Sequence, residues 1–285
     1  MITYYREFPQ TRLKMLTDSP LGQPTLYIEK YSADLLFPIS RSLGRDKIGL
    51  TKNLPFHGVD LWNGYELSWL DLKGKPLIAL IVLEYAAESA NIVESKSLKL
   101  YFNSFNQTHF DCMESVKMVI QSDLTKVIGL PVSVNLYSPN QFVENILIEF
   151  DGTCLDNLDI ETNCYLVDPS LLKNESEEYV EETLYSNLLK SNCLATGQPD
   201  WGSILIRYKG PKINEKGLLK YIISYRNHQG FHEHCVEQIF NDILNRCNPS
   251  KLTVFARYTR RGGLDINPFR SNFENAPKNL RQMRQ

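Results

Sequence analysis

The 285-residue chain lacks the features that mark a membrane or secreted protein. Its longest apolar stretch, PLIALIVLEYAA, is far shorter than a membrane span, and the N-terminal residues MITYYREFPQTRLK hold no apolar core of signal-peptide length. No GxGxxG motif follows a strand pattern, so a dinucleotide would have to bind without a Rossmann domain. We therefore expect a cytoplasmic protein with no membrane partner.

An excess of basic charge and closely spaced cysteines are also missing. The formal net charge is -2, which argues against direct binding of nucleic acid and favours a small-molecule partner. The six cysteines include no CxxC pair and are too sparse for a disulfide scaffold, so we expect reduced thiols. With 42% hydrophobic and 22% charged residues, the composition is that of an ordinary globular protein.

A faint internal repeat relates the two halves of the chain. Strand-like segments GYELSWLDLKGKP from Gly64 and GSILIRYKGPK from Gly202 both end in a Lys-Gly turn. Second strand patterns, ESKSLKLYFNSFN from Glu94 and EKGLLKYIISYRN from Glu215, share Glu, Leu, Lys and Asn at matching offsets before a phenylalanine. An amphipathic helix and a later strand, VSVNLYS or KLTVFARYT, complete each unit.

This repeat predicts an α+β fold of two tandem modules, each a mainly antiparallel sheet with helices on one face. We divide the chain at residues 1–165 and 166–285, although the linker EFDGTCLDNLDIETNC marks no single boundary. Apolar residues every four positions predict a further helix from Glu177 to Lys190. That helix would place Cys193 at a helix-to-loop junction.

Cys193 lies in the segment NCLATGQPDWGS, whose Gly, Pro and Asp favour a fixed, irregular path. Such a loop can present a reactive thiol, although a free cysteine is more often a buried structural residue. Asp200, seven residues later, is either a proton donor or acceptor for that thiol or an ordinary turn residue.

The segment GFHEHCVEQ places His232 and Glu233 at a helix start, where the dipole favours a carboxylate. Glu233 is therefore either a helix-start residue or a reader of a guanine-like ring, whose N–H and exocyclic amino group match its two oxygens. A metal site with His234 and Cys235 is disfavoured, because adjacent helical positions point in different directions and the usual zinc spacings are absent.

Two polar stretches carry groups suited to phosphate oxygens. In ESKSLKLY, strand alternation would place Ser95, Ser97 and Lys99 on one face. In YTRRGGLDINPFR, Arg260 and Arg261 precede two glycines that permit close backbone approach. The competing interpretations are a solvated strand edge and a surface loop.

Four blocks, ESKSLKLYFNSFNQTHF, CLATGQPDWGSILIRYKGP, HQGFHEHCVEQIF and ARYTRRGGLDINPFRS, together resemble the NADPH-dependent 7-cyano-7-deazaguanine reductases of queuosine biosynthesis, in their long two-module form. Their order across nearly the whole chain is more specific than any single block. The resemblance implies two tunnelling-fold modules, NADPH as cofactor and four-electron reduction of 7-cyano-7-deazaguanine to 7-aminomethyl-7-deazaguanine. Because tunnelling-fold sheets usually pair across subunits, it also implies at least a homodimer.

The same resemblance implies roles for individual residues. Cys193 would form a covalent thioimide with the nitrile carbon and Asp200 would be the proton donor. Whether Asp200 or His232 deprotonates Cys193 stays open. The deazaguanine would be bound by Ile92, Val93, Glu94, His232 and Glu233. The NADPH site would be bordered by Glu94 and Ser95 from the first module and by Arg261 and Gly262 from the second.

Two other functions remain open at this point. One is a cyclohydrolase-like tunnelling-fold enzyme that uses zinc to hydrolyse a purine or pterin ring. The other is a non-catalytic purine-binding or tRNA-associated module, against which the near-neutral charge counts modestly.

Overall fold

The structure is a computed structural model that describes residues 27–28, 30–51, 53–142, 147–194 and 196–285. The N-terminal segment in which we expect no signal-like core lies outside these residues, as does Ala195 in the Cys193 loop. Within the described ranges, no helix combines the length and the apolar character needed to cross a bilayer.

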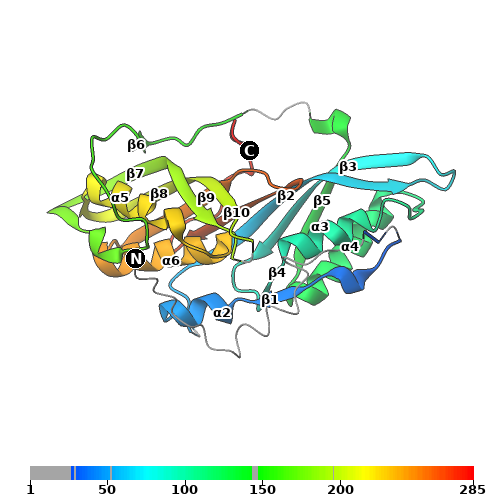
Figure 1. Ribbon diagram of the computed structural model, residues 1–285, viewed down its shortest axis with the longest axis horizontal. Coiled ribbons are helices and arrows are strands. Elements are labelled where there is room, and N and C mark those ends of the chain that lie inside the picture. The colour runs from blue at the N-terminus through cyan, green and yellow to red at the C-terminus, as the bar shows by residue number, and fades with distance from the viewer. Residues whose placement is uncertain (1–26, 29, 52, 143–146, 195) are drawn as a thin grey trace, which may run out of the picture.

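One eight-stranded sheet runs through the molecule (Figure 1). Its strands are β2 (His57–Leu70), β3 (Pro76–Ala86), β5 (Val132–Tyr137), β6 (Thr153–Cys154), β7 (Asn174–Asn192), β8 (Pro199–Ile213), β9 (Lys251–Tyr258) and β10 (Leu264–Ser271). The order is β5-β3-β2-β10-β9-β8-β7-β6, and only the short β6–β7 pair is parallel. A separate two-stranded sheet consists of β1 (Pro38–Ser40) and β4 (Asn91–Val93).

The two predicted antiparallel sheets are joined into one surface. Strand β2 of the first half pairs with β10 of the second, from His57 opposite Ser271 to Gly64 opposite Leu264. The α+β class is confirmed. The boundary at residues 165 and 166 falls between β6 and β7 and stays a prediction.

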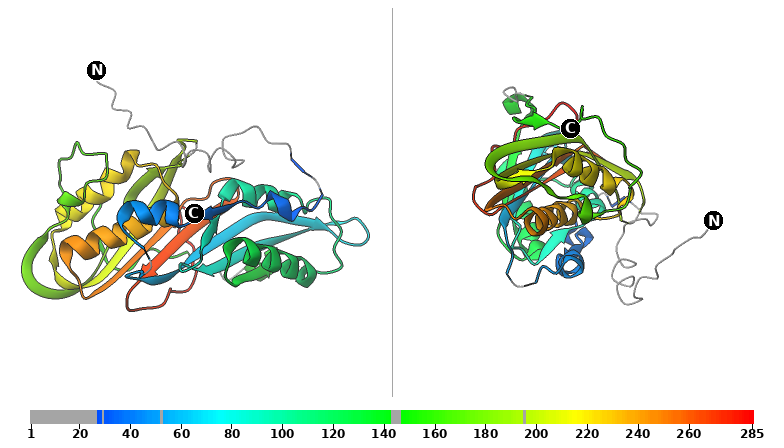
Figure 2. Two further views of the ribbon diagram at one scale, coloured as in Figure 1. Left: turned by 90° about the horizontal axis from the view of Figure 1, so that it is seen from below. Right: turned by 90° about the vertical axis from the view of Figure 1, so that its left-hand side faces the viewer.

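The longer helices cover one face of this sheet (Figure 1). They are α3 (Ser95–Asn103) and α4 (Met113–Ile128) in the first half and α5 (Glu215–Ser224) and α6 (His232–Cys247) in the second, with the short α2 (Ser42–Arg45) beside α6. Short 3-10 helices span Ala33–Leu35, Asp46–Ile48, Pro139–Phe142, Pro169–Leu171 and Tyr225–Asn227. In Figure 2 the long β7–β8 hairpin curves toward α5 and α6.

Alternation along the strands separates the core into two sides. On β9, Val254 and Ala256 pack with the helices, whereas Phe255 between them packs on the opposite face against Phe150 and Phe269. Burial on both faces explains why this strand is apolar almost throughout. The predicted helices α4 and α6 and the predicted strands β2, β5, β8 and β9 are confirmed.

The second strand predicted in each half is wrong, because these segments form α3 and α5. Glu94 caps α3 by accepting hydrogen bonds from the backbone N–H groups of Lys96 at 2.8 Å and Ser97 at 2.7 Å. Asn214 caps α5 in the same way through Gly217 N–H at 2.7 Å. Each cap satisfies N–H groups that a helix start leaves free, so Ser95, Ser97 and Lys99 do not share a strand face.

The helix predicted from Glu177 to Lys190 is also wrong, because these residues belong to β7. Residues four apart share a face on a helix and equally on a strand, since four is a multiple of the strand period of two. Long pairing with β8 decides between them, and β8 continues through Gly210, where a turn is predicted. Cys193 therefore follows a strand, in the connection of a β-hairpin.

Candidate active site

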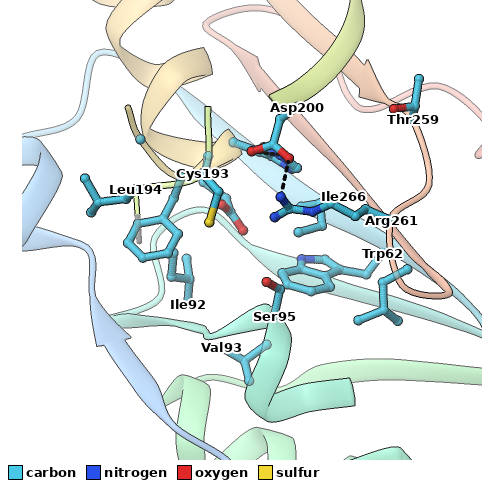
Figure 3. Close-up of a pocket in the computed structure, with 15 residues that line it drawn as sticks. Trp62, Ile92, Val93, Ser95, Cys193, Leu194, Asp200, Thr259, Arg261 and Ile266 are labelled. Carbon is cyan, nitrogen blue, oxygen red and sulfur yellow. Dashed lines mark ion pairs between the residues drawn. The ribbon is translucent and has the colours of Figure 1, made fainter. Parts of the chain in front are cut away.

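A cavity lies where the two halves meet, lined by residues of both. Figure 3 shows the thiol of Cys193 and the carboxylate of Asp200 facing this space, with Arg261 reaching toward Asp200. The lining residues are Trp62, Ile92, Val93, Ser95, Cys193, Leu194, Asp200, Gly230, Phe231, His232, Glu233, Thr259, Arg261, Leu264 and Ile266.

The β7–β8 hairpin brings Cys193 and Asp200 to the same end of two neighbouring strands. Cys193 N–H donates to the carbonyl of Gln198 at 2.8 Å, and Gly197 N–H donates to the carbonyl of Cys193 at 3.0 Å. Asp200 stands opposite Ser191, two residues before the cysteine. These hydrogen bonds hold the backbone of Cys193 in place, and the residue is only 7% exposed.

Backbone hydrogen bonds also tie the end of β7 to the start of α6. Asn192 N–H donates to the carbonyl of His228 at 2.8 Å, and Gly230 N–H donates to the carbonyl of Asn192 at 3.1 Å. Because α6 begins two residues after Gly230, these bonds place His232 and Glu233 beside the cysteine loop.

Asp200 is buried between two cationic or ionisable partners. Its Oδ1 lies 3.2 Å from Arg261 Nη1, and its Oδ2 lies 3.4 Å from His232 Nε2. The His232 ring stacks on Tyr258 with 3.8 Å between ring centroids, which fixes the imidazole in place. The arrangement supplies a carboxylate and an imidazole that can exchange a proton beside a thiol.

Glu233 is almost completely buried, and its Oε1 has no hydrogen-bond partner among the described residues. Burial, with a further contribution from the negative charge of Asp60, raises the pKa of Glu233 to about 8. A buried carboxyl oxygen without a donor is costly, and this oxygen belongs to a residue that lines the cavity, so it is free to accept a hydrogen bond from a bound molecule.

The first half contributes one wall of the cavity. Ile92 and Val93 come from β4, which β1 holds in register through Ile39, and Ser95 is the first residue of α3. Glu94 does not line the cavity among the described residues, because both of its oxygens cap α3, and burial raises its pKa. Its predicted contact with substrate or cofactor stays a prediction.

The two segments expected to hold NADPH meet in space. A Cβ atom added to Gly262 would lie 2.9 Å from Lys99 Nζ, so the glycine turn lies against α3. Lys96 and Lys99 line a neighbouring hollow, while Arg261 and Ser95 line the main cavity. The ammonium groups of Lys96 and Lys99 and the guanidinium group of Arg261 can pair with the phosphates of a dinucleotide.

Gly262→Ala should raise the KM for NADPH severalfold with little change in kcat. Gly262 has a φ of 61°, where an L side chain costs about 1 kcal/mol, and the methyl group would displace Lys99. Gly74→Ala is the matched control, because Gly74 has a φ of 84° but open space around its Cβ position. Steady-state kinetics of both variants provide the measurement; equal KM values would exclude a cofactor role for the Gly262 turn.

Comparison with known proteins gives matches in both halves of the chain. Residues 27–136 match the family described as "Nitrile reductase, 7-cyano-7-deazaguanine-reductase N-term", and residues 199–277 match that described as "QueF-like protein". Proteins named NADPH-dependent 7-cyano-7-deazaguanine reductase from Paraburkholderia phymatum and Burkholderia multivorans are both 57% identical over 94% of this chain and 98% of their own. This chain belongs to the 7-cyano-7-deazaguanine reductase family. Among solved structures, the archaeosine synthase QueF-Like in the apo form covers 35% of this chain at 17% identity and a TM-score of 0.30.

Cys235 and His234, adjacent in the sequence of this family member, have different surroundings. Cys235 is buried on α6, and burial raises the pKa of its thiol to about 12, which keeps the thiol protonated. His234 packs its ring against Gly44, and burial lowers the pKa of its imidazole to about 4. In the described ranges, no three His, Cys, Asp or Glu side chains are grouped as a metal site would require.

The start of α4 in the first half of this reductase-family chain carries no counterpart of the buried Glu233 side chain. The direct sequence offset between the halves pairs Glu233 with Cys112, which is exposed. Both α4 and α6 have sixteen residues, and aligning their starts pairs Glu233 with Glu114 instead. Glu114 is also exposed and lies 3.3 Å from Lys117, so neither pairing places a buried carboxylate there.

Sequence reasoning missed much of the cavity wall. The sequence predicts no role for seven further lining residues, which are Trp62, Leu194, Gly230, Phe231, Thr259, Leu264 and Ile266. All except Trp62 lie within the blocks that resemble the reductases. The alternation of β2 and β10 could have assigned Trp62, Leu264 and Ile266 to one face, but it could not have shown that this face meets Cys193.

Proposed function

We propose that this protein reduces the nitrile of 7-cyano-7-deazaguanine with NADPH through a covalent adduct on Cys193. The observation that carries this proposal is the shared cavity, which holds a buried thiol, a paired carboxylate at Asp200 and an unpartnered carboxyl oxygen at Glu233. Membership of the reductase family supplies the substrate and the cofactor. The residue roles rest on this geometry together with the sequence motifs.

Glu233 recognises the deazaguanine ring in this proposal. Its carboxylate accepts hydrogen bonds from the ring N–H and the exocyclic amino group, two parallel donors that match two carboxylate oxygens. An analogue without the amino group would leave one oxygen buried and unsatisfied, which gives discrimination. Ile92 and Val93 add an apolar wall beside the ring.

Cys193 then converts the nitrile into a group that accepts hydride. The proton of the thiol passes to Asp200, either directly or through His232, the sulfur forms a bond with the nitrile carbon, and the nitrogen takes this proton from Asp200 to give a thioimide. Two molecules of NADPH would supply the four electrons as two hydrides, the first to the thioimide carbon and the second to the imine carbon, with one proton taken up at each addition. Between the two additions the C–S bond breaks, so that the sulfur of Cys193 leaves as a thiolate and the imine remains.

Burial protects this sequence of steps. Cys193, Asp200 and Glu233 are each less than one-tenth exposed, although they come from a hairpin and a helix start. Exclusion of bulk water strengthens the ion pair between Asp200 and Arg261 and limits hydrolysis of an imine.

Binding of the nitrile should tighten as pH rises toward about 8. The anionic form of Glu233 accepts both donors, and its pKa of about 8 leaves most of the carboxyl protonated at pH 7. Binding therefore releases a proton, so Kd should fall about tenfold per pH unit below the midpoint and level off above it. Calorimetric titration of the Cys193→Ala variant measures this without covalent chemistry, and Glu233→Gln should remove the dependence.

The reaction itself is tested by following NADPH absorbance after addition of the nitrile to the unmodified protein. We expect two NADPH oxidised for each nitrile consumed, without added metal. A cyclohydrolase would instead open a ring without oxidising NADPH, and a binding module would consume neither compound. Either result would overturn the proposed function.

We also propose a homodimer in the cytoplasm. Strand β5 lies at one edge of the sheet, and only the two-residue β6 follows β7 at the other. Unpaired strand edges are templates for pairing, which supports closure of the sheet against a second copy. Light scattering should give the mass of a dimer or larger assembly; a monodisperse monomer would contradict this.

A further inference from the structure

A cluster of buried charges lies on the helix-facing side of the sheet, outside the set of residues that line the cavity. Its members are Arg41, Arg45, Asp60, Glu237 and Arg270, and all are less than one-tenth exposed. Asp60 forms ion pairs with Arg41 and, at 2.8 Å, with Arg270. Glu237 forms ion pairs with Arg270 at 2.9 Å and with Arg45 at 2.7 Å.

This cluster adjoins Glu233. Glu237 follows Glu233 by four residues on α6, so the two carboxyl groups share one face of the helix. Arg41 Nη1 lies 3.6 Å from Glu237 Oε1 and has no hydrogen-bond partner among the described residues. A guanidinium with an unused donor therefore lies on the face that also carries the unpartnered carboxyl oxygen of Glu233.

The charges of the cluster do not balance. Three guanidinium groups, from Arg41, Arg45 and Arg270, face two carboxylates, from Asp60 and Glu237, which leaves one positive charge in excess. Uncompensated charge is unfavourable in a buried environment. An ionised Glu233 supplies the third carboxylate and brings the local sum to zero.

We propose that Arg41 and Asp60 are positioning residues. Without lining the cavity, they change in opposite directions how readily Glu233 presents an anionic carboxylate to the substrate ring. This inference rests on the proposed function, because it takes Glu233 as the group that binds the ring. It goes beyond that function by assigning a role to two residues that do not line the substrate cavity.

Asp60 and Arg41 have opposite electrostatic effects on the ionisation of Glu233. The negative charge of Asp60 raises the pKa of Glu233, after the larger effect of burial, whereas the positive charges of Arg41 and Arg270 lower it. The other ionisable or charged groups around Glu233 and its cavity are Arg45 on α2, Tyr85 on β3, Cys193 after β7, Asp200 on β8, Arg261 after β9, and His232, His234, Cys235 and Glu237 on α6. Replacing Cys193 removes a further ionisable group and prevents the covalent step, so the titration reports binding alone.

The test measures the Kd of 7-cyano-7-deazaguanine by calorimetry between pH 6 and 9, in the Cys193→Ala background. Arg41→Gln and Asp60→Asn each remove one charge, and Arg270 stays bound to Asp60 or to the amide that replaces it. Arg41→Lys restores the charge. Asp242→Asn is the matched control, because Asp242 lies on the same helix but is hydrogen-bonded by Tyr221.

We expect the midpoint of the pH dependence to move up by about one pH unit in Arg41→Gln and down by a similar amount in Asp60→Asn. Below the midpoint, each unit corresponds to about a tenfold change in Kd. The Kd plateau at high pH should stay the same, Arg41→Lys should restore the original midpoint, and Asp242→Asn should not move it.

A merely structural role predicts a different pattern, in which both variants weaken binding at every pH without moving the midpoint. That pattern, or shifts in the same direction, would overturn the inference. If Arg41→Gln does not fold, the direction of the Asp60→Asn shift decides alone, since structural damage does not improve binding at low pH. Loss of binding and of NADPH oxidation in the unmodified protein would refute the proposed function instead.

Discussion

Cys193→Ala should abolish the covalent adduct that forms when the protein is mixed with 7-cyano-7-deazaguanine in the absence of NADPH. Turnover should fall by about 10³-fold or more, because without a thiolate the nitrile is not converted into a thioimide. Intact-protein mass spectrometry detects the adduct, and NADPH absorbance measures the turnover. Binding of the substrate should persist, since Glu233 and the apolar wall of the cavity are unchanged.

Cys112→Ala is the control for this experiment. Cys112 is exposed at the start of α4, whereas Cys193 is buried in the cavity, so general thiol reactivity would favour Cys112. We expect Cys112→Ala to retain both the adduct and the activity. An adduct that survives in Cys193→Ala would remove Cys193 as the nucleophile.

Asp200→Asn should lower kcat by about 10²-fold to 10⁴-fold, the range in which a positioned proton donor contributes. The amide keeps the shape of the side chain but cannot donate or accept the proton in the same way. It also loses the negative charge that Arg261 and His232 face at 3.2 and 3.4 Å. Single-turnover kinetics should show slower formation of the adduct, while the Kd measured in the Cys193→Ala background stays within about threefold.

Asp123→Asn provides a control of similar burial in the first half, where Tyr31 and Tyr101 donate hydrogen bonds to the Asp123 carboxylate. This variant should lose some thermal stability and keep the kcat of the parent protein. If Asp200→Asn turns over as fast as the parent, Asp200 has no part in the proton transfer.

Local rules predicted the long amphipathic helices but not the shorter ones. Helices α4 and α6 each extend over sixteen residues, which is enough for a 3.6-residue period to be distinguished from alternation. Helices α3 and α5 have nine and ten residues, and their starts depend on the caps formed by Glu94 and Asn214. Glu94, which is expected from the sequence to contact substrate and cofactor, is thus the residue that caps the start of α3.

The proximity of the candidate residues within each of two pairs could be predicted, because the members of each pair are close in sequence. Cys193 and Asp200 are separated by one hairpin connection, and His232 and Glu233 are adjacent at one helix start. Short separation in the sequence is enough to bring the two members of each pair together. The hydrogen bonds of Asn192 with His228 and Gly230, which join the two pairs, link residues too far apart in sequence for periodicity or motif spacing to reveal.

The sequence by itself determined the α+β class, the repeat, the reductase family and the candidate nucleophile, because these depend on patterns and motifs within short segments. Only the tertiary structure decided that β2 and β10 join the halves into one sheet. It also decided that Arg41, Asp60 and Arg270 form one charge cluster with Glu237, on the helix that carries Glu233. The physical reason is that burial and charge balance depend on which distant segments pack together. A side chain's neighbours in sequence do not define the electric field in which it ionises.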